Sequence, residues 1–285
     1  MKKNKLICVL LCAVILLCAF SVSAFADTGP KPSVNVEITG IEGEYYVTLL
    51  SKERSTGPAS AWDGTEENKN YARLDPVIWE KFTYYEDIDG FYFLQQAEKC
   101  AGNDTYKWGY YPPKTFKVLV YIPASDTFIV SEICERYAFD SYFRFDITAD
   151  GAVITESYDY APEIFSLAAR AVITVALEIL LALAFGYRAR GELLLISGVN
   201  IITQLALNIT LNAVNFHSGE YAFIAWYIML EFAVFAAEAV LYFAFLPRFA
   251  EKAKKRSLGV IYALAANTFS FAAGMLIAEI IPGIF

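Results

Sequence analysis

Hydrophobic and polar residues are arranged differently in three parts of the chain. A first apolar run covers residues 6–20, behind a cluster of lysines. Residues 27–163 alternate between short apolar and polar stretches, and residues 164–281 hold four long apolar segments. Period-two alternation is typical of half-buried strands, whereas apolar runs of about 20 residues are typical of membrane-spanning helices. The sequence therefore predicts an export signal, a β-rich domain and a helical membrane domain.

The N-terminus has the features of a secretory signal peptide. Lys2, Lys3 and Lys5 precede the apolar run, and Ala24-Phe25-Ala26 forms a cleavage site of the small-x-small type. We expect cleavage after Ala26, which assigns 1–26 to a signal peptide, with an uncleaved anchor as the alternative. Residues 27–162 then form an extracytoplasmic domain, and residues 163–285 form the transmembrane domain.

The exported domain is expected to be a β-sandwich-like fold built from short strands. Three hairpins are predicted, at 33–50, at 116–133 around Pro123-Ala124-Ser125-Asp126, and at 142–157 around Ala149-Asp150-Gly151. A short helix is predicted at 75–85, with Asp75 as its cap and Pro76 in its first turn.

Cysteines and aromatic residues suggest two further features of this domain. Cys100 and Cys134 are the cysteines that follow the signal segment, and in an oxidising compartment they favour one disulfide, with two buried thiols as the alternative. An aromatic group precedes Pro112-Pro113 and is predicted either to stack on a glycan or peptide or, as the favoured interpretation, to pack on the core. Its members are Tyr106, Trp108, Tyr110 and Tyr111.

The acidic segment Asp87-Ile88-Asp89-Gly90 resembles the start of a calcium-binding loop. The third acidic residue and the distal glutamate of that loop are missing, so an acidic turn is the favoured interpretation. The identity of any metal remains open, and the sequence predicts no cofactor.

Four spans are predicted at 164–186, 193–215, 221–246 and 258–281. Basic residues occur in the first and third connectors, for example Arg188, Arg190 and Lys254, and are lacking in the second connector. The positive-inside rule then places the β domain and the C-terminus outside, as the signal peptide also requires. Tyrosines near the span ends are expected to form interfacial belts on both sides. They are Tyr158, Tyr160, Tyr187, Tyr221 and Tyr242.

Each predicted span carries polar residues along one helical face. Spacings of three, four or seven residues put such groups on one stripe, and polar groups facing lipid are costly, so we expect them to face inward. The candidate intramembrane site consists of Arg170, Glu178, Asn200, Gln204, Asn208, Glu231, Glu238 and Asn267. For the asparagine and glutamine residues, hydrogen bonding between helices is the favoured role. For the three glutamates, a proton- or cation-linked function is favoured.

Composition limits the possible functions. Residues 27–163 hold 24 acidic and 12 basic residues, a formal charge of −12, which argues against binding to nucleic acid. No metalloprotease, P-loop, nucleophile-elbow or Cys-x-x-Cys motif occurs, and the one histidine, His217, lies in the second connector. An intramembrane enzyme is therefore the least favoured class.

Several segments of the chain resemble a group of plasma-membrane proteins of Firmicutes (Clostridia type), with an extracytoplasmic β domain and four C-terminal transmembrane helices. The segments include Lys-Pro-Ser-Val at 31–34, Glu-Tyr-Tyr-Val-Thr-Leu-Leu-Ser at 44–51 and Asn-Ile-Ile-Thr-Gln at 200–204. The resemblance implies a location with the β domain facing the cell wall, and it implies no activity.

The leading hypothesis is a non-enzymatic cell-surface membrane protein. Its β domain would bind an extracellular ligand or partner protein, and its helices would anchor it in the lipid bilayer, with a homo-oligomer as one possible assembly. The alternative is a proton- or cation-linked component of small-solute transport that uses the buried carboxylates.

Overall fold

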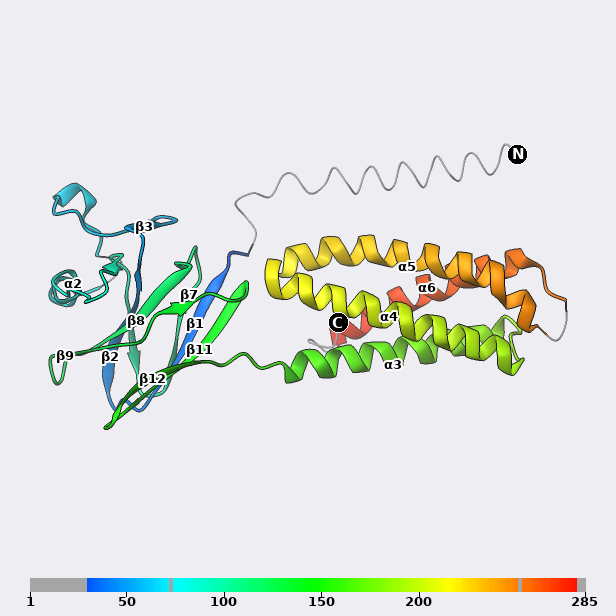
Figure 1. Cartoon of the computed structure of the whole chain (residues 1–285), viewed down its shortest axis with the longest axis horizontal. Coiled ribbons are helices and arrows are strands. Elements are labelled where there is room, and N and C mark those ends of the chain that lie inside the picture. The colour runs from blue at the N-terminus through cyan, green and yellow to red at the C-terminus, as the bar shows by residue number, and fades with distance from the viewer. Residues whose placement is uncertain (1–29, 72–73, 251–252, 281–285) are drawn as a thin grey trace. The chain divides into compact units, whose positions relative to one another are not determined.

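The computed structural model describes residues 30–71, 74–250 and 253–280. The predicted signal peptide therefore lies outside the described residues. The chain divides into a β unit, Lys31–Ile164 with the short segment Phe216–Gly219, and a helical unit, Phe165–Asn215 with the residues from Glu220 onward. Figure 1 shows the strands of the first unit and the long helices of the second.

The β unit contains two main sheets. The first has the strand order β12-β11-β1-β7, and the second has the order β10-β8-β2-β5, with β6 also paired to β2 and β9 to β8. The strands of the first sheet are β1 Ser33–Thr39, β7 Asp104–Trp108, β11 Asp140–Thr148 and β12 Gly151–Glu156. The strands of the second are β2 Glu44–Ser51, β5 Tyr92–Phe93, β6 Glu98–Ala101, β8 Thr115–Ile122, β9 Thr127–Val130 and β10 Cys134–Glu135. Two short strands, β3 Ser55–Thr56 and β4 Ala59–Ser60, pair with each other.

Side chains from both main sheets form one hydrophobic core. Alternate residues of β1 and β11 meet alternate residues of β2 and β8, because successive side chains of a strand point to opposite faces. The core members from these strands are Val34, Val36, Ile38, Tyr45, Val47, Leu49, Phe116, Val118, Val120, Phe143, Phe145 and Ile147. The structure thus confirms a mostly-β domain with a shared interior.

Two of the three predicted hairpins are confirmed, and the first is wrong. β8 pairs with β9, and β11 pairs with β12, both antiparallel. β1 instead pairs with β11 in parallel and with β7, while β2 pairs with β8 in the other sheet. The connection between β1 and β2 crosses between sheets through Gly40 and Gly43, which have positive φ angles of 85° and 86°. Ile41 lies between them with its side chain in the core.

The predicted short helix is confirmed as α2, Pro76–Thr83. The Val77 amide donates to Asp75 Oδ1 at 2.8 Å, so Asp75 caps the helix as expected. Trp79 and Phe82 of α2 pack over the outer face of the second sheet, in a cluster that also contains Leu119. A 3₁₀ turn, η2 Glu66–Asn68, precedes this helix.

Cys100 and Cys134 are both buried free thiols, so the predicted disulfide is not formed. Cys100 lies on β6 opposite Tyr45, and Cys134 lies on β10 opposite Phe116. Since β2 and β8 separate the two strands, the cysteines are about 14 Å apart across the sheet and about 20 Å apart along it, from standard strand spacings. A disulfide requires Cα atoms within about 7 Å, and this topology cannot bring them together.

The helical unit contains α3 Ala161–Ala184, α4 Arg190–Ser218, α5 Glu220–Phe249 and α6 Arg256–Ile280. Within the described residues, three segments are long and apolar enough to cross a membrane: Ile164–Ala184, Arg190–Ser218 and Glu220–Phe249. These three helices indicate a membrane protein. The fourth predicted span, 258–281, extends beyond the described residues, and α6 is not among the three.

Candidate functional site

The polar stripes of the helices face the interior of the helical unit. Arg170, Glu178, Asn200, Gln204, Asn208, Glu238 and Asn267 are all buried, although nearby apolar residues such as Val172 and Ile202 are more than two-thirds exposed. Glu231 is half-buried. Apolar side chains therefore cover the outside of the helices, and these polar ones lie inside beside a buried apolar cluster, as expected for a protein surrounded by lipid.

Glu238 of α5 is held by hydrogen bonds from two other helices. Thr203 Oγ1 of α4 donates to Glu238 Oε1 at 2.8 Å, and Asn267 Nδ2 of α6 donates to Glu238 Oε2 at 2.6 Å. Both carboxylate oxygens therefore have neutral donors, and this glutamate links α4, α5 and α6. Hydrogen bonds from two donors stabilise the charged form of this carboxyl.

Glu178 of α3 is in a different situation. Its side chain is 1% exposed, and neither carboxylate oxygen has a hydrogen-bond partner among the described residues. Glu238 lies within electrostatic range of it. Two carboxylates in a dry interior repel each other, and one proton or cation between them removes that repulsion.

Asn200 lies near Glu178 and has an acceptor atom without a partner. Its Nδ2 group donates to the Ile196 carbonyl at 3.1 Å and to Tyr242 Oη at 3.0 Å. The Ile196 carbonyl only accepts, so the amide orientation is fixed and both hydrogens are used. Asn200 Oδ1 has no partner among the described residues. The Glu178 carboxylate and this amide oxygen are therefore both acceptors without a donor in the described part of the chain. A proton on Glu178, or a bound cation, would satisfy them.

A small cavity lies next to a second group of polar side chains. Its volume is about 20 Å³, which is room for about one water molecule. Asn208 Oδ1 and Ser270 Oγ line it and have no protein partner among the described residues. Further polar lining comes from Arg170, Thr174, Gln204, Tyr227, Glu231 and Asn267. One water molecule that donates to both unpaired oxygens would satisfy this site.

The structure joins these groups into one polar interior, because Asn267 both lines the cavity and bonds to Glu238. The described residues contain no group of three His, Cys, Asp or Glu side chains that could hold a metal. Carboxylate, amide and hydroxyl oxygens favour protons or hard cations over zinc.

Sequence reasoning missed two residues of this unit and misplaced two. Tyr262 and Glu192 are buried, and Tyr262 Oη donates to the Glu178 carbonyl at 3.0 Å. Glu192 accepts from the Arg188 and Ala189 amides and pairs with Lys254 at 2.7 Å. Tyr187 and Tyr242, predicted for an interfacial belt, are 2% and 0% exposed and pack against Tyr262 instead. The sequence near a span end is the same whether the tyrosine lies at the membrane interface or in the interior of the helical unit.

The predicted aromatic group of the β unit is divided between core and surface. Tyr106 and Trp108 are buried in the shared core, whereas Tyr110 and Tyr111 are about 40% exposed and pack edge to face at 4.8 Å. The favoured interpretation, packing on the core, holds for the first two residues. The four do not form one stacking surface.

The acidic segment at 87–90 is an acidic turn closed by a lysine. Lys117 Nζ contacts Asp87 Oδ1 at 2.8 Å and Asp89 Oδ2 at 2.5 Å, where a calcium ion would otherwise lie between the carboxylates. Burial acts to lower the pKa of Lys117, but hydrogen bonds to the two aspartates outweigh it and raise that pKa above its usual value. The ammonium group therefore neutralises this turn.

No protein-family model and no curated protein matches the chain.

Proposed function

We propose that this chain is a non-enzymatic cell-surface protein of the plasma membrane. In this proposal residues 1–26 are a cleaved signal peptide, the two main sheets form an extracytoplasmic β-sandwich that binds a ligand or partner, and α6 is a fourth span. The membrane domain is then a four-helix bundle with its C-terminus outside. The shared core of the two sheets supports the sandwich, and the basic first and third connectors support the orientation.

The second part of the proposal concerns the interior of the bundle: the Glu178–Glu238 pair binds one exchangeable proton or small cation. The observation that carries it is the Glu178 carboxylate, which is buried near Glu238 and the Asn200 side chain and has neither oxygen hydrogen-bonded among the described residues. A purely structural carboxylate is expected to have donors, as Glu238 has. A bound proton would let Glu178 donate to Asn200 Oδ1, and a cation would bind to both oxygens.

The water-sized cavity supports a route to this pair. Asn267 connects the cavity to Glu238, and Glu231 lies at the cavity wall. The second candidate function is therefore a proton- or cation-linked membrane component, which we propose takes part in small-solute transport.

Infrared difference spectroscopy on the purified protein tests the pair directly. A change of pH or of Na⁺ concentration is expected to alter the carboxyl signal of the wild type, and Glu178→Gln should remove that change while the helices stay folded. The matched control is Glu220→Gln, since Glu220 is an exposed residue at the start of α5. An unchanged signal in Glu178→Gln would contradict the proposal.

Proteoliposomes test the consequence for transport. Ion or proton flux driven by a pH or Na⁺ gradient is expected for the wild type, and Glu178→Gln and Glu238→Gln should each abolish it. Absence of flux from the wild type under every gradient would remove the transport function. The infrared measurement would still decide whether the Glu178–Glu238 pair binds a proton or a cation.

A further inference from the structure

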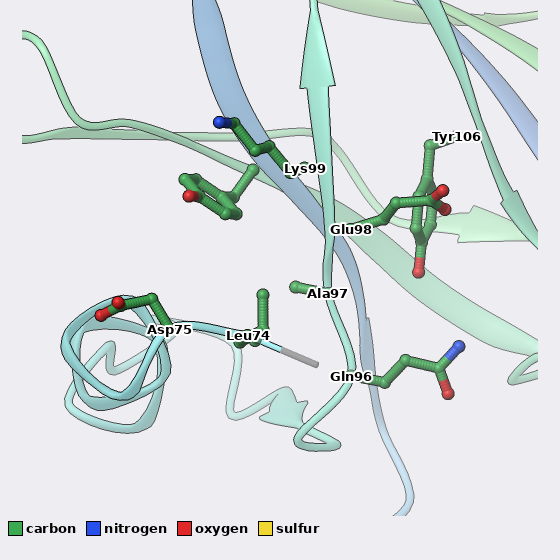
Figure 2. A pocket seen from close by; sticks show the side chains of 8 residues that line it. Leu74, Asp75, Gln96, Ala97, Glu98, Lys99 and Tyr106 are labelled. Atoms are coloured by element: carbon green, nitrogen blue, oxygen red, sulfur yellow. The ribbon is translucent and has the colours of Figure 1, made fainter. Parts of the chain in front are cut away.

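A cavity of about 480 Å³ lies at one edge of the second sheet, beside β6 (Figure 2). This volume lies in the range of pockets for small molecules. The side chains that matter below are Tyr46, Asp75, Gln96, Glu98, Lys99 and Tyr106.

The cavity exists because the edge of this sheet is interrupted. β5 and β6 both pair with β2, and the residues between them, Leu94–Ala97, leave the strand path. Gln95 has a positive φ of 57°, and its buried amide donates to the Ser60 and Asn68 carbonyls. The interruption is therefore fixed by hydrogen bonds, so the pocket is preformed.

Tyr106 supplies a buried polar group without a partner. Its side chain is 1% exposed, and its Oη has no hydrogen-bond partner among the described residues. Tyr45, also buried, shows the usual arrangement, because its Oη donates to the Gly102 carbonyl at 2.8 Å. Native proteins rarely leave a buried hydroxyl unpaired, so the Tyr106 hydroxyl at the cavity is available to hydrogen-bond a ligand group or a water molecule there.

The other polar groups set the chemistry of that ligand. Gln96 and Glu98 extend from the strand toward the side on which Tyr106 lies, and Asp75 lies on the other side (Figure 2). Lys99 is paired with Glu44 at 2.7 Å, so its charge is already balanced. Asp75 and Glu98 then make the lining negative, which disfavours phosphate and carboxylate ligands.

We propose that this pocket binds a small amine that also carries hydroxyl groups, of the amino-sugar class. Hydroxyl groups both donate and accept, which matches the Tyr106 hydroxyl and the Gln96 amide. One ammonium group complements Glu98, and a second one complements Asp75 on the other side of the strand. The inference rests on the proposed ligand-binding role of the β domain and is independent of the Glu178–Glu238 pair.

Calorimetric titration of the full-length protein in detergent micelles tests the inference. The probe is the β-1,4-linked disaccharide of glucosamine, and the comparison ligands are its N-acetylated form and the glucose disaccharide. Saturable binding of the glucosamine disaccharide is expected, at least about tenfold tighter than either comparison ligand because each lacks the charged donors.

Variants separate ligand binding from folding. Tyr106→Phe should weaken binding about 2- to 12-fold, the usual value of one hydrogen bond, without lowering the thermal unfolding temperature. Tyr45→Phe is the matched control: it should lower that temperature and leave affinity unchanged. Glu98→Gln should weaken binding about tenfold.

Three results would overturn the inference: no saturable binding of the glucosamine disaccharide, equal binding of the glucose disaccharide, or wild-type affinity in Tyr106→Phe. Proton binding at Glu178 is measured by infrared spectroscopy on the same protein. Failure of the pocket and failure of the membrane site are therefore distinguishable.

Discussion

Replacement of Lys117 by methionine tests whether the buried charges of the β unit are coupled as the structure indicates. The Lys117 side chain is 4% exposed and that of Asp87 is 0% exposed, so the variant leaves a buried carboxylate without its cation. Loss of one partner from a buried ion pair costs about 3–5 kcal/mol. Asp87 Oδ2 also accepts from the Asp89 and Phe91 amides at 3.0 and 3.2 Å. These donors place the expected loss near the lower limit, about 3 kcal/mol.

The contact with Asp89 adds little to this value. The Asp89 side chain is 49% exposed, and pairs with an exposed partner contribute about 0–1 kcal/mol. The double variant Lys117→Met/Asp87→Asn should recover part of the loss, since no uncompensated buried charge remains. Lys99→Met is the surface control: Lys99 and Glu44 are 52% and 65% exposed, and its cost should stay below about 1 kcal/mol.

Urea unfolding of the full-length protein in detergent micelles, followed by tryptophan fluorescence, measures these free energies. Three of the four tryptophans, Trp62, Trp79 and Trp108, lie in the β unit, and a Trp226→Phe background confines the signal to that unit. The reasoning is refuted if Lys117→Met costs no more than Lys99→Met, or if the double variant is as unstable as the single one.

The pH dependence of this effect has a defined sign. The pKa of Lys117 is raised in the folded protein, so its stabilising contribution is complete below the unfolded value of about 10.4. The contribution is lost as the pH rises through the folded pKa. The difference between wild type and Lys117→Met should therefore be constant from pH 7 to 9 and should shrink above about pH 10.4.

Three further predictions concern packing, thiols and the helical connectors. Gly40→Ala would place a Cβ 1.8 Å from the Ile147 carbonyl oxygen, whereas the Cβ of Gly43→Ala meets nothing within 4 Å. Urea unfolding should therefore show that Gly40→Ala lowers the free energy of unfolding by more than about 3 kcal/mol. Gly43→Ala should lower it by about 1–2 kcal/mol. Burial raises the pKa of Cys100 to about 12 and that of Cys134 to about 11. At about pH 8 both thiols of the folded protein should therefore react with iodoacetamide about 200-fold or more slower than in urea. Fast labelling of the folded protein would contradict this prediction. Glu192→Ala removes the acceptor of two amides and of Lys254. It should lower the free energy of unfolding in detergent, followed by Trp226 fluorescence, by about 2 kcal/mol or more. Glu220→Ala, at an exposed site, should lower it far less.

Local patterns in the sequence predicted the elements that depend on neighbouring residues. The hairpins β8–β9 and β11–β12 follow from alternation on either side of a short turn, and α2 follows from Asp75 and Pro76. The long apolar helices and their inward polar stripes follow in the same way, because apolar length and residue spacing act along one segment. These features need no knowledge of the rest of the chain.

Only the tertiary structure decided which segments meet. Alternation in β1 and β2 fits a hairpin as well as two strands in separate sheets, and pairing of β1 with β11, 107 residues away, resolved the choice. The same pairing pattern separated Cys100 from Cys134 and placed Tyr106, not Tyr110, beside a cavity. In the helices, residue spacing brought Glu178 inside. Thr203 donates to Glu238 and Asn200 donates to Tyr242, so neither Glu178 oxygen has a hydrogen bond among the described residues. Hydrogen bonds between distant segments depend on which partners compete for each donor, and that competition is settled only when the whole chain is folded.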